Sequence, residues 1–297
     1  MSSSDESGFI VRTITAPDGL KLHARDYGGD RSSVSGLPPV ICLPGLTRNS
    51  RDFHQLALLL SSDAIAPRRV ITLDARGRGL SAWDDDKSHY NLVVEAQDVL
   101  AMCAALHISK AVFIGTSRGG LVLHLLTVSH PDLLKAVILN DIGPVLEKEG
   151  LGDIRDYLNR DRKPGDWSEA VDILRENHGG TFTALAEEDW RDMARAIYTV
   201  TDGKIAADYD PAIAAQMQSL DLEAPLPDLW PQFEAFQTIP LMVIRGENSK
   251  LLATATVEEM ARRHPGMTAK IALGQGHAPI LHVGDIPAAI RDFLATL

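Results

Sequence analysis

The sequence predicts an α/β fold with a mostly parallel sheet, and three observations support this fold class. Short apolar runs alternate along the chain with segments of helical periodicity, as they do in β-α-β units. Several of these runs are apolar throughout, which is typical of strands that are buried on both faces. The chain has 297 residues, 45% of them hydrophobic, which suits one large domain or a domain with an insertion.

The N-terminal half begins with a predicted antiparallel hairpin and continues as alternating strands and helices. Residues 9–15 and 20–27 alternate between apolar and polar side chains around an Asp18–Gly19 turn. A loop rich in Gly and Ser follows over residues 28–38. The next expected elements are a strand 39–43, a helix 52–61, a strand 69–73, a helix 91–107, a strand 110–114, a helix 121–129 and a strand 135–139. This order predicts parallel strands joined by right-handed crossovers.

The pattern changes between residues 145 and 238, where no strand is expected. Helical stretches cover residues 167–176, 187–200 and 211–220, and this acidic region holds all but one of the tryptophans. We interpret it as an all-helical insertion over the ends of the sheet, within a core made of residues 1–144 and 239–297. The alternation then resumes with a strand 241–245, a helix 254–264, a strand 268–273 and a helix 286–297, so that eight strands are expected in all.

Charge and cysteine content argue against several classes of function. The formal net charge is −11 and no basic cluster is longer than Arg262–Arg263, so a nucleic-acid partner is not expected. Cys42 lies in an apolar run and Cys103 in a helical pattern, which predicts buried small side chains without a disulfide or a metal site. Residues 1–8 lack the features of a signal peptide, and no apolar stretch reaches membrane-spanning length. We therefore expect a cytoplasmic protein without a membrane partner.

A strand, a sharp turn and a helix meet around the pentapeptide 115–119, which reads Gly-Thr-Ser-Arg-Gly. Glycines on either side of Ser117, in the spacing G-x-S-x-G, let two backbones pass closely and leave the hydroxyl exposed at the tip of the turn. The helix N-terminus beneath it offers backbone N–H groups to a developing anion. The same residues also suit an ordinary turn in which the serine only caps the helix. The pentapeptide alone leaves both interpretations open.

Four loops, taken in chain order, carry a resemblance to the α/β-hydrolase family that covers nearly the whole chain. They are residues 43–46, 74–81, 115–119 and 274–278, and each follows a predicted strand at the carboxyl end of the sheet, where ligands bind in such folds. The resemblance implies an eight-stranded, mostly parallel sheet flanked by helices, with residues 145–238 as a helical cap. It also implies that Ser117 is a nucleophile and that His277 is its base.

The acid that would orient His277 departs from the family pattern. The loop after strand 241–245, where the family has its acid, carries Ser249 and Lys250 instead. Some relatives, such as haloalkane dehalogenases, take the acid from the end of the preceding strand of the sheet, which here offers Asp141. Asp141 is our first choice and Glu247 our second. A turn-capping role for Asp141, and a protein that has no working acid, both stay open.

The resemblance further implies that the backbone N–H groups of Leu46 and Arg118 hold the oxyanion. The side chains of Arg118 and Arg48 could pair with the acidic insertion, meet a substrate carboxylate or lie solvated at the surface. We interpret the glycines and arginines of residues 74–81 as turn residues and a local ion-pair network without a catalytic role. The large aromatic residues of the insertion either fill its core or line an acyl pocket, and they are Trp167, Trp190, Trp230, Tyr157 and Tyr198.

We therefore expect a serine hydrolase that cleaves a carboxylic ester, a lactone or a similar acyl substrate through an acyl-enzyme, with no cofactor and no metal. Hydrolysis of a carbon–carbon bond in a ring-cleavage product is the nearest alternative within the fold. A catalytically weak protein that binds a small molecule is another alternative, which Lys250 in the acid loop keeps open. The choice of substrate depends on how the side chains of the insertion pack.

Overall fold

Eight strands form one twisted sheet in a computed structural model that describes residues 8–29, 36–160 and 162–297. The polar N-terminal stretch 1–7 and positions 30–35 of the predicted loop lie outside the described residues. The strands are β1 (Phe9–Thr15), β2 (Lys21–Tyr27), β3 (Val40–Leu43), β4 (Val70–Leu73), β5 (Ala111–Thr116), β6 (Leu134–Asn140), β9 (Leu241–Gly246) and β10 (Thr268–Ala272).

The strand order is β1-β2-β4-β3-β5-β6-β9-β10. β2 pairs antiparallel with both β1 and β4, and every other pair in the sheet is parallel. The predicted fold class is thus confirmed. The carboxyl ends of β3, β5, β6, β9 and β10 all lie at the same edge, so the loops that follow these strands are brought together there.

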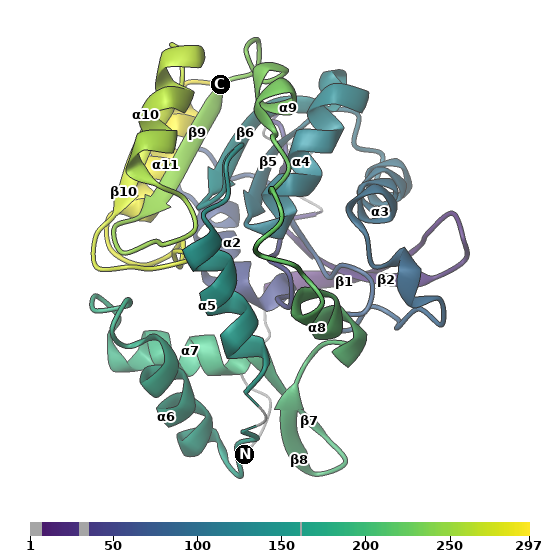
Figure 1. The fold of residues 1–297 in the computed structure, drawn as a ribbon. Coiled ribbons are helices and arrows are strands. Elements are labelled where there is room, and N and C mark those ends of the chain that lie inside the picture. Colours follow the sequence, from purple (N-terminus) through teal and green to yellow (C-terminus); the bar gives the residue numbers. More distant parts are fainter. Residues whose placement is uncertain (1–7, 30–35, 161) are drawn as a thin grey trace.

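Helices cover both faces of the sheet (Figure 1). α2 (His54–Ser61) and α11 (Ile286–Ala295) pack on one face, and α3 (Leu92–Ala105), α4 (Arg118–Ser129) and α10 (Thr254–Arg263) pack on the other. The helices between β6 and β9 are α5 (Lys148–Leu158), α6 (Trp167–His178), α7 (Glu187–Ile197), α8 (Pro211–Gln218) and α9 (Trp230–Glu234). Short 3-10 turns are η1 (Ser50–Phe53), η2 (Lys87–His89) and η3 (Pro131–Leu133).

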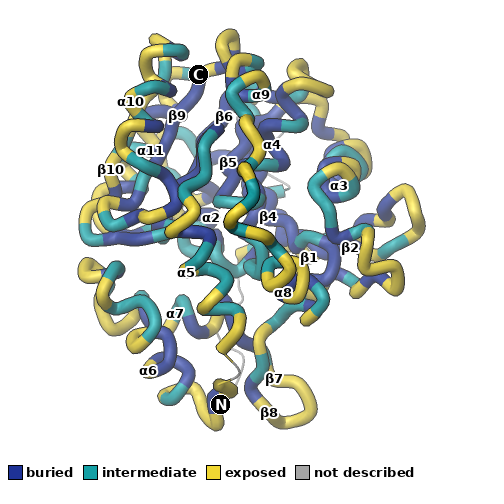
Figure 2. The backbone as a smooth tube through the Cα atoms, in the orientation of Figure 1, coloured by how far each residue is buried: buried dark blue, intermediate teal, exposed yellow. Residues whose placement is uncertain are grey.

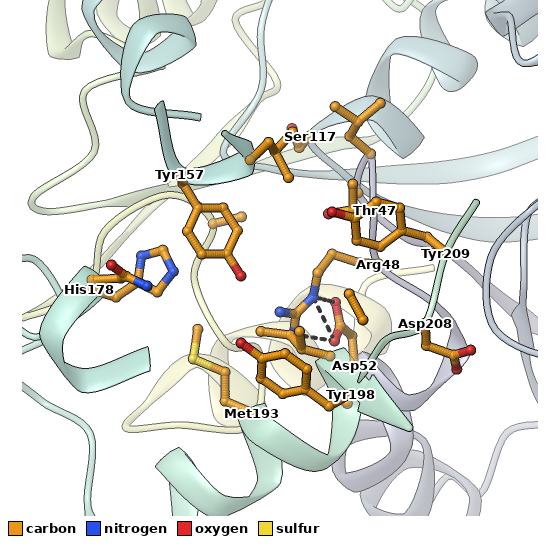
Figure 3. A pocket seen from close by; sticks show the side chains of 18 of the residues that line it. Thr47, Arg48, Asp52, Ser117, Tyr157, His178, Met193, Tyr198, Asp208 and Tyr209 are labelled. Carbon is orange, nitrogen blue, oxygen red and sulfur yellow. Dashed lines mark hydrogen bonds and ion pairs between the residues drawn. The ribbon is translucent and has the colours of Figure 1, made fainter. Parts of the chain in front are cut away.

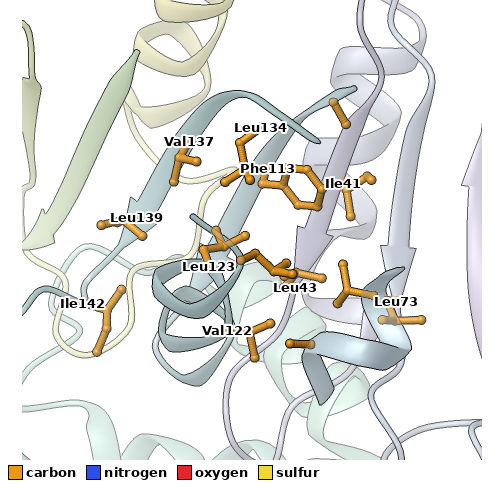
Figure 4. Packing of buried hydrophobic residues seen from close by; sticks show 14 of the residues in the cluster. Ile41, Leu43, Leu73, Phe113, Val122, Leu123, Leu134, Val137, Leu139 and Ile142 are labelled. Atoms are coloured by element: carbon orange, nitrogen blue, oxygen red, sulfur yellow. The ribbon is translucent and has the colours of Figure 1, made fainter. Parts of the chain in front are cut away.

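Alternate residues of the central strands point to opposite faces of the sheet and build two hydrophobic layers. Ile41 faces the layer beneath α3 and α4, whereas its neighbour Val40 faces the layer beneath α2 and α11. Figure 4 shows Phe113 of β5 beside Ile41, with Leu123 of α4 packed below them. Full burial of such a side chain stabilises the fold by roughly 1.5–3 kcal/mol. The sheet is therefore a rigid base for the loops at its edge, and its central strands are the dark, buried part of Figure 2.

Cys42 in β3 and Cys103 in α3 are buried free thiols, as the sequence predicts. Burial raises the pKa of Cys103 to about 12, so this thiol stays protonated and unreactive. No helix in the described ranges is long and apolar enough to cross a membrane.

The inserted segment (residues 145–238) is mostly helical, but the expectation that it is all-helical is wrong. β7 (Tyr198–Thr201) and β8 (Lys204–Ala207) form a separate antiparallel hairpin in it. Asp202 and Gly203 at its tip both have a positive φ, 51° and 73°, as a two-residue hairpin turn requires. A third hydrophobic cluster joins α6, α7 and the hairpin. Figure 1 shows these elements and α5 beyond the carboxyl ends of β5, β6 and β9.

Candidate active site

Ser117 lies in the sharp turn between β5 and α4. Its backbone angles, φ 49° and ψ −114°, are ones that residues other than glycine rarely adopt. The turn can form because Gly119 passes directly over β3, where a Cβ atom would overlap the carbonyl oxygen of Leu43. The N–H of Ser117 donates to the carbonyl of Asn140 at 3.0 Å, which fixes the turn to the end of β6. The residue therefore stands at the carboxyl edge of the sheet, where it lines a large cavity.

The side chain of Ser117 begins a hydrogen-bonded chain that runs through His277 to Asp141. Nε2 of His277 lies 3.0 Å from Oγ of Ser117, and Nδ1 lies 2.8 Å from Oδ2 of Asp141. Because a carboxylate can only accept, Nδ1 carries the ring hydrogen and Nε2 is left to accept the hydroxyl proton of the serine. The structure thus brings together the residues that the sequence predicts as nucleophile, base and acid.

Asp141 is completely buried at the end of β6, and two further donors surround its carboxylate. The N–H of Gly246 donates to Oδ1 at 2.9 Å, and the hydroxyl of Ser249 donates to Oδ2 at 2.6 Å. Such bonds offset the cost of burying a charge. The loop after β9 therefore supports Asp141 in place of supplying an acid of its own. Glu247 is exposed and binds the backbone N–H of Gly274 at 2.7 Å, so it does not join this group.

Asn140 fixes the loop that carries His277. Its side-chain amide donates to the carbonyl of Pro279 at 2.9 Å and to the hydroxyl of Thr116 at 3.1 Å. Thr116 ends β5 directly before the serine, and Asn140 ends β6 directly before the aspartate. The histidine loop is therefore tied to the same two strand ends that hold its hydrogen-bonding partners.

Two backbone N–H groups near Ser117 are available as donors. Arg118 is the first residue of α4, so its N–H has no acceptor within the helix. In the loop after β3, the carbonyl of Gly45 accepts from the N–H of Arg48 at 3.2 Å, and this carbonyl shares a peptide plane with the N–H of Leu46. Because the two groups of a trans peptide point in opposite directions, the N–H of Leu46 is directed away from Arg48. A Cβ atom on Gly45 would lie 3.8 Å from Cβ of Ser117, so this loop lies against the serine.

A buried ion-pair network connects the loop after β3 to the start of α4. Arg78 donates from Nε to the carbonyl of Leu46 at 2.8 Å and from Nη1 to Glu95 at 2.9 Å. Glu95 also binds Nε of Arg118 at 2.8 Å. Burial acts to raise the pKa of Glu95, but the two arginines outweigh it and hold the pKa below its usual value. The Arg118 side chain thus pairs with Glu95, a role that was not expected, and it pairs with no described residue of the inserted segment.

The loop 74–81 has the structural role that the sequence predicts. Arg76 is buried and pairs with Asp98 at 2.7 Å, with Asp84 at 2.6 Å and with Asp18 at 2.9 Å. Asp18, Asp84 and His89 come close enough together to ligate a metal ion. Both of these aspartates already bind Arg76, so ion pairing accounts for their arrangement.

The cavity in front of the serine has a volume of about 1660 Å³ and lies between the sheet edge and the inserted segment. Tyr157 of α5 and Tyr198 of β7 line it (Figure 3). The tryptophans of the inserted segment do not line it. Trp190 is buried among α6, α7 and the hairpin, Trp230 packs against the sheet layer, and Trp167 is 41% exposed. The large aromatic residues of this segment are therefore divided among core, cavity and surface.

Lys250 joins the loop after β9 to α5. Its ammonium pairs with Glu149 at 3.0 Å and with Asp153 at 3.3 Å. A Cβ atom on Gly150 would lie 2.5 Å from Cα of Leu251, so α5 packs directly on the loop backbone at a position that only glycine allows. The lysine at the usual position of the acid thus holds the inserted segment against the sheet edge.

Several cavity residues were not anticipated from the sequence. His178 of α6, Tyr209 and His282 all line the cavity. Burial, and to a lesser extent Arg48 and Arg160, lowers the pKa of His178 to about 4, so this ring is neutral near pH 7. These residues come from separate elements and carry no motif, so no signal in the order of residues identifies them.

The sheet order and the strand, turn and helix around Ser117 are features of the α/β-hydrolase fold. The chain belongs to the α/β-hydrolase family, whose model, described as alpha/beta hydrolase fold, matches residues 38–281. A crystal structure of an α/β hydrolase from Novosphingobium aromaticivorans is similar, with a TM-score of 0.88 and 39% identity. That alignment covers 97% of this chain and 99% of the other.

Curated relatives that match most of the chain include two hydrolases. The 3-hydroxybutyrate-oligomer hydrolase of Cupriavidus necator is 31% identical over 286 residues, which is 94% of each chain. The 2-(acetamidomethylene)succinate hydrolase of Mesorhizobium japonicum is 25% identical over 258 residues, covering 87% of this chain and 85% of that protein. With the family match, these similarities make the protein a hydrolase of the α/β fold.

Proposed function

We propose that the protein is a serine hydrolase that cleaves carboxylic ester bonds through an acyl-enzyme. The observation that carries the proposal is the hydrogen-bonded chain from Ser117 through His277 to Asp141, which opens on a cavity at the sheet edge. A serine hydroxyl is a poor nucleophile near pH 7 unless an adjacent base removes its proton as it attacks. The neutral imidazole, oriented by a buried carboxylate, is such a base.

In the first half of the proposed reaction, Oγ of Ser117 attacks the ester carbonyl carbon while Nε2 of His277 takes its proton. The carbonyl π electrons move to oxygen, and the N–H groups of Leu46 and Arg118 stabilise that oxyanion. When the intermediate collapses, the C–O bond to the alcohol breaks and the imidazolium returns its proton to the leaving alkoxide. Asp141 stabilises the positive charge on the ring throughout.

In the second half, water attacks the acyl-serine and gives one proton to Nε2 of His277. The second tetrahedral intermediate collapses, the acyl–Oγ bond breaks, and Ser117 takes the proton back. The products are a carboxylic acid and an alcohol, and no redox step or cofactor is needed.

We further propose a short oligoester of a hydroxycarboxylic acid as the substrate class. The relative from C. necator is named for oligomers of 3-hydroxybutyrate, whose units are joined by ester bonds. The cavity of about 1660 Å³ also exceeds the roughly 300–1,000 Å³ of most small-molecule sites. It has room for more than one hydroxyacid unit.

The test is covalent labelling with a fluorophosphonate, followed by hydrolysis of a chromogenic ester and of the linear 3-hydroxybutyrate dimer. Wild-type protein is expected to be labelled and to cleave both esters. Ser117→Ala is expected to lose the label and to lower kcat by on the order of 10⁶. Ser129→Ala, an exposed serine at the other end of α4, is the matched control and should behave as wild type.

Folded wild-type protein that takes no label and cleaves no ester would contradict the proposal. Cleavage of a carbon–carbon bond in a ring-cleavage diketone, without ester hydrolysis, would replace it by the alternative reaction of this fold.

A further inference from the structure

Arg48 carries a guanidinium into the cavity from a position next to Ser117. A Cβ atom on Gly45 would lie 3.5 Å from Cγ of Arg48 and 3.8 Å from Cβ of Ser117, so both side chains begin close to Gly45. Asp52 binds the guanidinium through Nε at 2.8 Å and through Nη2. The remaining nitrogen, Nη1, has no hydrogen-bond partner within the described part of the chain. One edge of the guanidinium is therefore held, and the other is free to donate.

Two tyrosines flank that free edge. Figure 3 shows the hydroxyls of Tyr157 and Tyr198 on one side of the guanidinium of Arg48, with Asp52 on its other side. Neither hydroxyl bonds to any described residue. Burial raises the pKa of both phenols, so both keep their protons near pH 7 and can donate. Three donors without a protein acceptor thus face one part of the cavity.

We propose that Arg48, Tyr157 and Tyr198 form a subsite for a free carboxylate of the substrate. This inference rests on the proposed function and narrows its substrate class to esters that carry a carboxylate a few atoms from the bond that is cleaved. A carboxylate has two oxygens that can accept from the guanidinium and from both phenols. The acid end of a linear hydroxyacid oligoester has this chemistry.

Asp52 shapes how selective this subsite is. The carboxylate of Asp52 offsets the positive charge of Arg48. The subsite therefore recognises an anion mainly by the positions of its hydrogen-bond donors and less by net charge. His178 beside Tyr157 is neutral near pH 7, with a ring-centroid distance of 4.8 Å, so it adds no competing charge. A carboxylate bound there would be close to Ser117 without contacting the catalytic histidine's partner Asp141, which is buried behind the ring.

The experiment measures binding by calorimetry with Ser117→Ala protein, which holds the ligand without cleaving it. The ligands are the linear 3-hydroxybutyrate dimer as the free acid and as its methyl ester, which differ only in the carboxylate. The acid is expected to bind at least tenfold more tightly than the methyl ester. Adding Arg48→Met together with Asp52→Asn, which removes both charges and leaves no unpaired buried carboxylate, is expected to remove this preference.

Two further variants separate the subsite from the fold. Tyr157→Phe deletes one donor at nearly constant volume and should weaken binding of the acid several-fold while leaving the methyl ester within about twofold. Arg191→Met removes an exposed cation of α7 that does not line the cavity, and it should change neither affinity.

Equal affinity of the acid and the methyl ester for Ser117→Ala protein, or an equal loss for both ligands on substitution of Arg48, would overturn the subsite. Hydrolysis of 4-nitrophenyl butyrate by wild-type protein tests the proposed function separately, because this neutral ester has no carboxylate. Failure of the carboxylate subsite and failure of the proposed ester hydrolysis therefore give different results.

Discussion

At the scale of single residues, Asp141 and Glu95 show how the fold keeps buried charges near Ser117. Asp141 accepts from a backbone N–H, a serine hydroxyl and the histidine ring. Glu95 is shared between Arg78 and Arg118. Both carboxylates are satisfied by donors on loops of the sheet edge, so each one links segments that lie far apart in the chain.

Asp141→Asn is expected to lower kcat by about 10⁴ with little change in KM. An amide at this position presents a donor to Nδ1 of His277, which favours the wrong ring tautomer for a base. Glu247→Gln is the matched control, and its turnover should stay within about twofold of wild type because this carboxylate binds only exposed backbone. Steady-state hydrolysis of a chromogenic ester measures both. Unimpaired turnover in Asp141→Asn would remove this residue from the proposed mechanism.

Glu95→Gln is expected to lower the free energy of unfolding by about 3–5 kcal/mol, because it leaves two arginines in a buried network without their anion. Its side chain is 5% exposed. Glu187 forms an ion pair with Arg175 in which both side chains are about half exposed, at 55% and 42%. Glu187→Gln should therefore cost no more than about 1 kcal/mol. Urea unfolding measures the loss of unfolding free energy in both variants. Equal losses would show that breaking the buried Glu95 network costs no more than breaking an exposed ion pair.

At the scale of elements, α4 contains a buried histidine that makes its stability depend on pH. Nδ1 of His124 donates to the carbonyl of Gly120 at 2.8 Å, and its ring packs edge-on against Phe236 with a centroid distance of 5.1 Å. Burial lowers the pKa of His124 to about 4, against about 6.5 in an unfolded chain. The unfolded state thus binds a proton more readily between these values. The contribution of the buried, neutral His124 ring to stability is complete above about pH 6.5 and is lost as the pH falls toward 4.

We expect the His124 contribution to fall by about 1.4 kcal/mol per pH unit within that window, reaching a loss of about 3 kcal/mol. His124→Asn keeps a donor for the carbonyl of Gly120 but does not titrate. The difference in unfolding free energy between the two proteins, measured with urea at pH 7.5, 5.5 and 4.5, should therefore change in favour of the variant as the pH falls. A constant difference across the three pH values would show that His124 is not buried in its neutral form.

Elements with a clean periodicity could be predicted from the sequence, whereas α5, α9 and the β7–β8 hairpin of the inserted segment were not anticipated. α10 is expected over 254–264 and observed over Thr254–Arg263. α5 has a polar sequence with two glycines, and it packs on the loop after β9 through Gly150 and Lys250, which are tertiary contacts. The β7–β8 hairpin did carry a signal, Asp202–Gly203, but helical periodicity extended the expected helix to residue 200 and concealed β7.

The residues of the candidate site also divide into those that the sequence could predict and those that it could not. Ser117 and His277 could be proposed from the sequence because each follows a strand in a loop that matches the family. Asp141 could be proposed because it follows the preceding strand of the sheet, while Ser249 and Lys250 stand at the usual positions of the acid. Arg48 and Tyr198 lie in the loop after β3 and in β7, 150 positions apart in the numbering. Their approach depends on how the inserted segment packs over the sheet edge, and local sequence contains no record of that packing.

At the scale of the whole molecule, the sheet edge supplies Ser117, His277 and Asp141, and the inserted segment supplies the opposite wall of the cavity. A chamber of about 1660 Å³ has the volume for several hydroxyacid units of the proposed substrate. We therefore expect kcat/KM for neutral oligoesters to stay within about threefold from dimer to tetramer. Chromatography of the products from oligomers of defined length, capped as methyl esters, measures this dependence.

Narrowing the chamber should introduce a length limit. Met193 of α7 lies in the cavity near Tyr198 (Figure 3), and Met193→Trp adds bulk there. Overpacking of this kind costs roughly 1–3 kcal/mol when the space is needed by a ligand, so kcat/KM for the tetramer should fall about tenfold or more. The dimer should be cleaved within about twofold of the wild-type rate, since it leaves part of the chamber empty. An equal loss for dimer and tetramer would mean that Met193→Trp disturbs the reactive groups themselves and that chamber volume does not set the length of the substrate.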